Sequence, residues 1–220
     1  NKKGKIRLNK RCCNKNDKMK LNIPFYKQES KNDCGPTALQ MVLEYLEEKH
    51  SREELVNLVY SDKSGTTWTL GLAVAAAKLG FKTELYSKHL GFNPENYKLE
   101  FYQKEADNKD LSKLKLEQLR LEANELGIKM QEETLTLSKL LSKISESCVA
   151  IILLDWSKIK QTNEFIGHFV PIVGYDDENV YVHNQGFHNP GKFIKINRDL
   201  FDEARKSKGT DEDIVYIYRK

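Results

Sequence analysis

The sequence predicts an α+β fold, in which a helical amino-terminal half packs on an antiparallel β-sheet. Apolar residues recur at intervals of three and four up to about residue 144, as in amphipathic helices. Short apolar or alternating runs follow from residue 148 onward, as in strands. A length of 220 residues with 39% hydrophobic side chains is enough for one domain with a sizeable core.

Capping residues and glycines divide the helical half into elements. Asp33 and Pro36 suit the start of a first helix, and Ser51 with Glu54 forms a capping box for a second. We expect a strand over residues 81–86 and helices over 34–48, 51–60, 66–80, 110–126 and 135–144. Residues 91–109 read mostly as a loop, and residues 105–128 are a candidate helical insertion or lid.

The carboxy-terminal third is rich in strand patterns. The strands are expected over residues 148–154, 167–175, 180–183, 192–196 and 214–218. Residues 176–179, with the sequence Asp-Asp-Glu-Asn, lie between two of these strands and predict a hairpin turn.

The formal charge of +4 is unevenly distributed. Residues 1–20 hold nine Lys or Arg and one Asp, a charge of +8, which leaves −4 for residues 21–220. We therefore expect a basic disordered tail or added extension over 1–20, with Met19 as a plausible natural start, and one domain over 21–220. A mildly acidic domain gives no support for nucleic-acid binding, and the chain has no apolar run long enough to span a membrane.

Four cysteines, Cys12, Cys13, Cys34 and Cys148, do not form the pattern of a disulfide framework. A reducing compartment fits best, so we expect a cytoplasmic protein, with Cys148 as a small buried hydrophobe. The chain has no Cys-x-x-Cys pair, so we expect no zinc site and no cofactor.

Cys34 is the candidate nucleophile because it begins a predicted helix. A free thiol has a pKa of about 8.5 and needs help to ionise, and the unpaired N–H groups of a helix start supply partial positive charge. A cysteine that merely begins a helix is the alternative for this residue taken alone. On the catalytic interpretation, Cys34 should be the most reactive thiol of the folded domain near pH 6.

Three further residues complete a candidate catalytic site. His168 opens an apolar strand and is the candidate general base, and Asn184 on the next strand is the candidate to orient it. Gln28, six residues before Cys34, can donate its side-chain amide to the oxyanion of a tetrahedral intermediate. Taken singly, a structural histidine and a surface glutamine are the more common interpretations.

Asn184 can orient His168 only if the hairpin places both side chains on one face of the sheet. His168 and Asn184 have even numbers, so they share a face only if the numbers of each directly paired set of residues add up to an even value. A two-residue turn at 176–177 would pair residue 175 with residue 178, which gives an odd sum. We therefore predict an odd-length loop, or a bulge with the same effect, at residues 176–179. On opposite faces, the orienting acid would have to be another residue, such as Asp155.

Together these motifs resemble the bacteriocin-leader-processing cysteine peptidases, family thirty-nine of the cysteine class, in the papain-like superfamily. The resemblance lies in Gln-x5-Cys-Gly-Pro-Thr at 28–37 and in Gly-His-Phe-Val-Pro-Ile-Val-Gly-Tyr at 167–175, and its nearest branch lacks a transporter. The His and Asn lie 134 and 150 residues after the Cys, against about 130–150 in papain-like enzymes. The resemblance implies a papain-like fold, no metal, and attack by Cys34 on a peptide carbonyl, with Gln28 in the oxyanion hole and His168 as base. The family usually has Asp, often followed by Pro, where this chain has Asn184 and Gln185.

We therefore expect a bacterial or archaeal thiol hydrolase, a monomer that cleaves peptide or isopeptide bonds in a peptide or protein substrate. A thiol acyltransferase or transpeptidase of the same fold is one alternative, and a catalytically silent peptide-binding module is another. Candidates for substrate contact are Trp68, Trp156 and His188.

Overall fold

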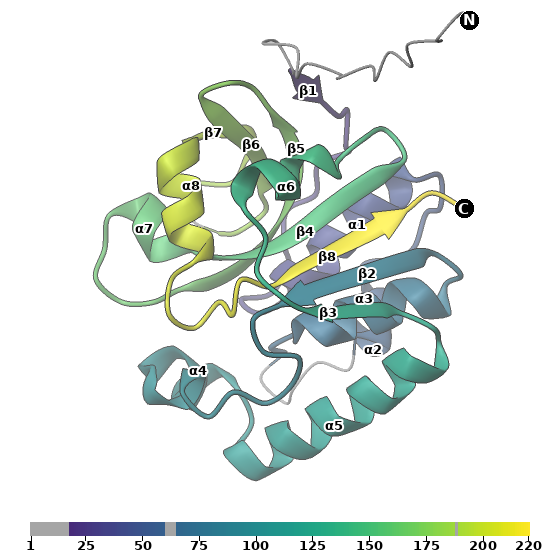
Figure 1. Cartoon of the computed structure of the whole chain (residues 1–220), viewed down its shortest axis with the longest axis vertical. Coiled ribbons are helices and arrows are strands. Elements are labelled where there is room, and N and C mark those ends of the chain that lie inside the picture. The colour runs from purple at the N-terminus through teal and green to yellow at the C-terminus, as the bar shows by residue number, and fades with distance from the viewer. Residues whose placement is uncertain (1–17, 60–64, 188) are drawn as a thin grey trace, which may run out of the picture.

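The computed structural model describes residues 18–59, 65–187 and 189–220, which form an α+β fold with one mixed sheet (Figure 1). The strand order is β3-β2-β8-β4-β5-β6-β7, and β1 pairs with β5 outside this path. The strands are β1 Met19–Lys20, β2 Lys82–Ser87, β3 Lys129–Glu132, β4 Cys148–Asp155, β5 Gly167–Tyr175, β6 Asn179–Asn184, β7 Gly191–Asn197 and β8 Ile214–Tyr218. The predicted fold class is confirmed.

One strand pair departs from the antiparallel sheet that the sequence predicts. Strands β2 and β3 run parallel, with Glu84 opposite Lys129. Their connection contains two α-helices, which gives it the length that a parallel crossover needs. The other strand pairs of the described residues are antiparallel.

The helices are α1 Cys34–Tyr45, α2 Arg52–Leu58, α3 Thr69–Lys78, η1 Asn96–Lys98 (a 3₁₀ turn), α4 Glu100–Glu105, α5 Lys109–Glu125, α6 Leu137–Ser142, α7 Trp156–Lys160 and α8 Arg198–Arg205. The five expected helices are present, mostly with shorter ends. The Ser51 hydroxyl accepts from the Glu54 N–H, as the capping box predicts. The sequence analysis missed η1, α4, α7 and α8, because elements of three to eight residues are too short to show a helical period.

The helices cover both faces of the sheet. In Figure 1, α1 and α3 lie behind the central strands, whereas α6 and α8 lie in front of them. Strand β4 is buried along its whole length between these layers. Helix α5 packs against α3 through Leu116, Leu119 and Ala123, so most of the candidate insertion is a further helical layer. No helix among the described residues is long and apolar enough to cross a membrane.

The amino-terminal segment joins the sheet slightly earlier than the predicted domain boundary. Residues 1–17 of the candidate tail lie outside the described residues. Met19 and Lys20 pair with Tyr175 and Gly174 of β5, and the next residue, Leu21, donates its N–H to the Val173 carbonyl at 2.8 Å. The first described residues of the domain therefore pair with the carboxy-terminal end of β5, the strand that carries His168.

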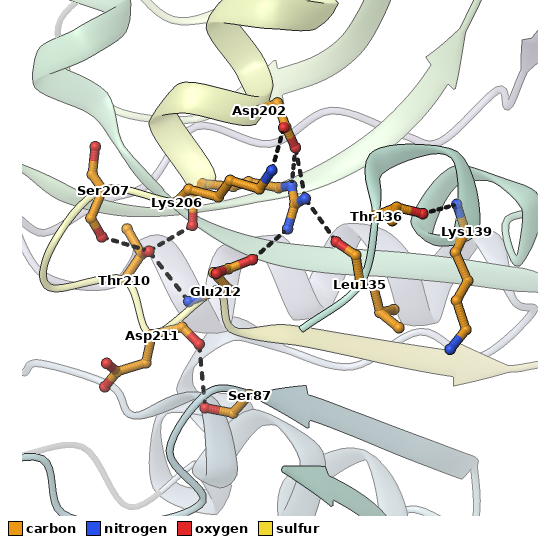
Figure 2. Close-up of polar contacts among 11 residues, drawn as sticks. Ser87, Leu135, Thr136, Lys139, Asp202, Lys206, Ser207, Thr210, Asp211 and Glu212 are labelled. Carbon is orange, nitrogen blue, oxygen red and sulfur yellow. Dashed lines mark hydrogen bonds and ion pairs between the residues drawn. The ribbon is translucent and has the colours of Figure 1, made fainter. Parts of the chain in front are cut away.

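A fully buried guanidinium holds the loop between α8 and β8. Arg205 donates to Asp202 at 2.7 Å, to Glu212 at 3.0 Å and to the Leu135 carbonyl at 2.7 Å. Figure 2 shows Asp202, Glu212 and Leu135 grouped at the base of this loop, with Asp211 extending beyond them. Because a buried charge is costly without partners, these three contacts fix the loop in one position.

Candidate functional site

The four predicted catalytic residues line one cleft. Cys34, His168, Asn184 and Gln28 all contribute to a cavity of about 690 Å³. Helix α1 supplies the thiol, β5 supplies the imidazole and β6 supplies the amide of Asn184. Residues as far as 156 positions apart in the sequence therefore meet at one place.

Cys34 lies at the first position of α1, as predicted, and its side chain is only partly exposed. Asp33 occupies the N-cap position, but its carboxylate does not cap the helix. It instead accepts from the backbone N–H groups of Glu29 and Ser30 and from Arg52. Asp33 therefore shapes the loop that precedes the cysteine, and Arg52 balances its negative charge.

Burial disfavours the charged forms of both Cys34 and His168. Burial raises the pKa of Cys34 to about 11, which outweighs the lowering effect of backbone N–H groups from Phe169, Gly35 and Cys34 itself. Burial likewise lowers the pKa of His168 to about 4. Both shifts oppose the thiolate near pH 6 that the helix start alone suggests.

Asn184 holds His168 in one tautomer. The His168 Nε2 lies 3.0 Å from the Asn184 Oδ1. The Asn184 Nδ2 donates to the Asn189 carbonyl at 2.9 Å, and its Oδ1 also accepts from the Gly186 N–H. These bonds define the amide oxygen as the acceptor, so Nε2 must carry the proton. The Nδ1 atom of the neutral ring is then an unprotonated nitrogen, the form that a base needs.

A bulge in β5 places His168 and Asn184 on the same face. At the turn, Tyr175 pairs with Val180, an odd sum, but Ile172 pairs with Val182, an even sum. The shift lies between Ile172 and Gly174. The predicted face and the predicted hydrogen bond are therefore confirmed, but the bulge lies within β5 and not at residues 176–179. A single extra residue in one strand reverses the facing of all later pairs.

The alternative acid, Asp155, has a structural role. Its Oδ1 accepts from the Ser157 N–H, the Ser157 hydroxyl and the Ile166 N–H. It caps α7, the helix that the sequence analysis missed. His183, which precedes Asn184 on β6, bonds to the Ile23 carbonyl and accepts from the Phe193 N–H.

Gln28 lies in the cleft with its amide nitrogen already bonded. Nε2 donates to the Ser30 carbonyl at 2.9 Å and to the Lys31 carbonyl at 3.0 Å. Oε1 is buried without a partner in the described part of the chain. Donation to an oxyanion would therefore require Nε2 to leave one of these carbonyls.

The substrate-contact candidates differ in their surroundings. Trp156 packs edge-on against the His168 ring, with centroids 5.0 Å apart, and lines the cleft beside it. Trp68 stacks on Tyr102 at 5.9 Å, and Tyr102 stacks in turn on Phe165. These rings form an aromatic wall in the cleft. His188 lies outside the described residues.

The same cleft is lined by two carboxylates that the sequence analysis missed. Asp211 accepts from Asn93 at 2.8 Å and from Asn96 at 2.7 Å, and Asp213 accepts from the Thr69 hydroxyl. Burial, reinforced by the neighbouring Asp211, raises the pKa of Asp213 to about 7. The acidic run at residues 211–213 was a visible signal, but the sequence did not show that Asp211 and Asp213 line the cleft.

Gln185 is a further residue that only the structure reveals at the site. Its side chain is fully buried, and Nε2 donates to the Cys34 carbonyl at 2.8 Å and also to the Phe169 carbonyl. In the described residues, no group of three or more His, Cys, Asp or Glu side chains is arranged to hold a metal ion.

Two solved structures of C39-type peptidases share this fold. A C39-like peptidase from Bacillus anthracis has a TM-score of 0.57 and 15% identity, and covers 93% of this chain and 98% of its own. The peptidase domain of Streptococcus ComA, a bi-functional ABC transporter of a quorum sensing pathway, has a TM-score of 0.50 and 15% identity. The match covers 89% of this chain and 97% of that domain. The fold is therefore that of the papain-like C39 peptidases.

The sequence family carries a different name. A family model described as guanylylate cyclase matches residues 23–217, and the chain belongs to this family. Guanylyl cyclase 1 of Arabidopsis thaliana is 27% identical over 212 residues, which are 90% of this chain and 76% of that protein.

Proposed function

We propose that the protein is a thiol hydrolase that cleaves peptide or isopeptide bonds through an acyl-enzyme on Cys34. The observation that carries the proposal is the His168 tautomer that Asn184 selects, in a cleft that also contains a helix-start cysteine. A nucleophile, a base and an orienting residue in that order are the parts that covalent catalysis requires.

In the proposed mechanism, the reaction starts from a thiol on Cys34 and a neutral imidazole on His168. As the sulfur of Cys34 attacks the carbonyl carbon, its proton passes to Nδ1 of His168, and the imidazolium then gives that proton to the leaving amine. Water attacks the resulting thioester with His168 again as base, which releases the acid and restores the thiol. The raised pKa of Cys34 and the lowered pKa of His168 favour a proton transfer that accompanies attack over one that precedes substrate binding.

Activity-based labelling with mass mapping, followed by a peptide-library cleavage screen, tests the proposal. The folded protein should be labelled at Cys34, and cleavage should disappear in Cys34→Ala. Cleavage that persists in Cys34→Ala would contradict the mechanism. Product formation with an added amine in place of water would identify an acyltransferase, and peptide binding with an unreactive Cys34 would identify a silent binding module.

Cyclisation of GTP is a second candidate, favoured by the family and by the name of the Arabidopsis relative. The ribose 3′-oxygen would attack the α-phosphorus and release pyrophosphate, a reaction that needs no thiol nucleophile. Incubation with GTP and Mg²⁺ or Mn²⁺, with mass-spectrometric detection of cyclic GMP, tests it directly. Cyclic GMP formation that survives Cys34→Ala would favour this candidate, and its absence from the wild-type protein would remove it.

A further inference from the structure

Gln185 touches more of the site than any other residue described above. Its amide nitrogen donates to the carbonyls of Cys34 and Phe169. Its own backbone carbonyl accepts the Gln28 N–H at 3.0 Å. It also follows Asn184 directly in the sequence. One side chain and its peptide therefore join the segments that supply the nucleophile, the base, the orienting amide and the candidate oxyanion residue.

The bonds around Cys34 form a closed arrangement. The Phe169 N–H donates toward the Cys34 sulfur, while the carbonyls of both residues accept from the same amide nitrogen. Because Phe169 follows His168 on β5, this arrangement fixes the start of α1 relative to the strand that carries the imidazole. Any movement between the two elements would have to break one of these bonds.

The unpaired oxygen of Gln185 suggests that its amide hydrogens matter. Oε1 is buried and has no partner in the described ranges, which is unfavourable. An apolar side chain of the same length would avoid this cost, yet could not bond to the two carbonyls. The presence of glutamine here, despite its unsatisfied Oε1, indicates that the two N–H groups of its side chain are needed for the bonds to the Cys34 and Phe169 carbonyls.

We propose that Gln185 is a positioning residue, which sets the separation of Cys34 and His168 by joining the Cys34 and Phe169 carbonyls through one amide. The inference rests on the proposed function, because the separation matters only if a proton passes between the two side chains. Displacement of reacting groups by about 1 Å commonly costs on the order of 100-fold in rate. Asp33 precedes Cys34 and is paired with Arg52, and Gln185→Met adds no charge beside this pair.

The first test compares Gln185→Met with Gln40→Met. Methionine has the length of glutamine but no hydrogen-bond donor. Gln40 is a suitable control because it lies on α1, the helix that begins at Cys34, and its side-chain amide donates to the His50 carbonyl away from the cleft. In Gln185→Met, we expect kcat for peptide cleavage to fall roughly 10–100-fold with KM within about threefold, since substrate binding is not the affected step. Gln40→Met should match the wild type.

The second test uses Gln185→Glu, which has the same shape. A protonated carboxyl can donate to one carbonyl, whereas a carboxylate can donate to neither. The ratio of its kcat to that of the wild type should therefore decrease as pH rises from 5 to 8. A purely structural contact would lower the melting temperature without such a pH-dependent ratio.

Cys34 alkylation by iodoacetamide, followed by mass mapping, separates the two proposals. At pH 8 we expect alkylation roughly tenfold slower in Gln185→Met, because the Phe169 N–H no longer stabilises the thiolate, with Cys148 unchanged. A wild-type protein that cleaves no peptide, yet shows this difference, would remove the hydrolase function and keep the positioning role. The positioning role would be overturned if both Gln185 variants had the kcat and the Cys34 alkylation rate of the wild type. It would also be overturned if both variants failed to fold.

Discussion

The amide of Asn184 determines which nitrogen of His168 is available as a base. Its nitrogen is held by the Asn189 carbonyl and its oxygen by the Gly186 N–H, so the amide cannot turn over without losing both bonds. The orientation is therefore set by the loop after β6 as well as by the pair itself. An aspartate at this position would keep an acceptor for His168 but place an oxygen against the Asn189 carbonyl.

We predict that Asn184→Ala lowers kcat/KM by roughly 10–100-fold, because His168 loses its tautomer and its orientation. Asn184→Asp should retain more activity than Asn184→Ala, since an acceptor for Nε2 survives. Steady-state cleavage of a peptide found in the library screen measures both. Equal activity of wild type and Asn184→Ala would show that the hydrogen bond has no catalytic role.

Gln28→Ala is predicted to lower kcat by about 100–1000-fold, the usual effect of losing one oxyanion donor. For this to hold, Nε2 must exchange the Ser30 or Lys31 carbonyl for the oxyanion when substrate binds. Alkylation of Cys34 by a small reagent should change little, which separates this variant from damage to the thiol. If turnover is unchanged in a folded Gln28→Ala, the glutamine only supports the loop.

The extended pairing of β5 connects His168, the proposed general base, with the first residues of the described domain. The His168 end of β5 faces the cleft, whereas its other end receives Met19 and Lys20 of β1. Gly174 allows this approach, because a Cβ there would lie 2.5 Å from the Met19 carbonyl oxygen. Leu21, only 1% exposed, follows directly and enters the core.

Deletion of residues 1–18 is therefore predicted to leave the melting temperature and the activity unchanged, because β1 and Leu21 are retained. Deletion of residues 1–21 should destabilise the fold by about 2–4 kcal/mol, the usual cost of losing one buried leucine. Chemical denaturation of both truncated proteins beside the full chain measures the difference. A large loss of stability in the shorter deletion would show that the basic segment contributes to the fold.

The sequence predicted elements best where the apolar pattern is long. Strands β5 and β8 begin and end at the expected residues, and the meeting of Cys34, His168 and Asn184 in one cleft follows from motifs. The role of Gln185 could not be predicted, because its partners lie 151 and 16 residues away and are backbone carbonyls. Every residue has a backbone carbonyl, so the sequence does not show which carbonyls a side chain will contact. The position of the β5 bulge likewise depends on the pairing of β5 with β1 and β6.

At the scale of the whole molecule, one cleft is lined both by Cys34 and by Asp213. Asp213 keeps its proton to about pH 7 in the folded state, because burial and the nearby Asp211 disfavour its charge. The unfolded chain gives up the same proton near the ordinary aspartate pKa of about 3.9. Between these values the folded state binds more protons, so this group lowers stability as pH rises.

Asp213→Asn removes this titration and should show the difference directly. Near pH 4 both proteins carry a neutral side chain, so we expect melting temperatures within about 1 °C. At pH 8 the variant should melt roughly 8–16 °C higher, since the wild type alone carries a buried charge. Differential scanning calorimetry at both pH values, with the exposed Asp177→Asn as control, measures this. The same difference at both pH values would contradict the raised pKa.

The bulge near Val173 also constrains how the gene can change. The segment between β5 and β6 spans Asp176 to Glu178, and the even register beyond the bulge brings Asn184 to His168. Gain or loss of one residue in this turn would send every later side chain of β6 to the wrong face. Among active descendants, the turn can therefore lengthen or shorten only in steps of two, unless the bulge disappears or a second one arises in the same lineage.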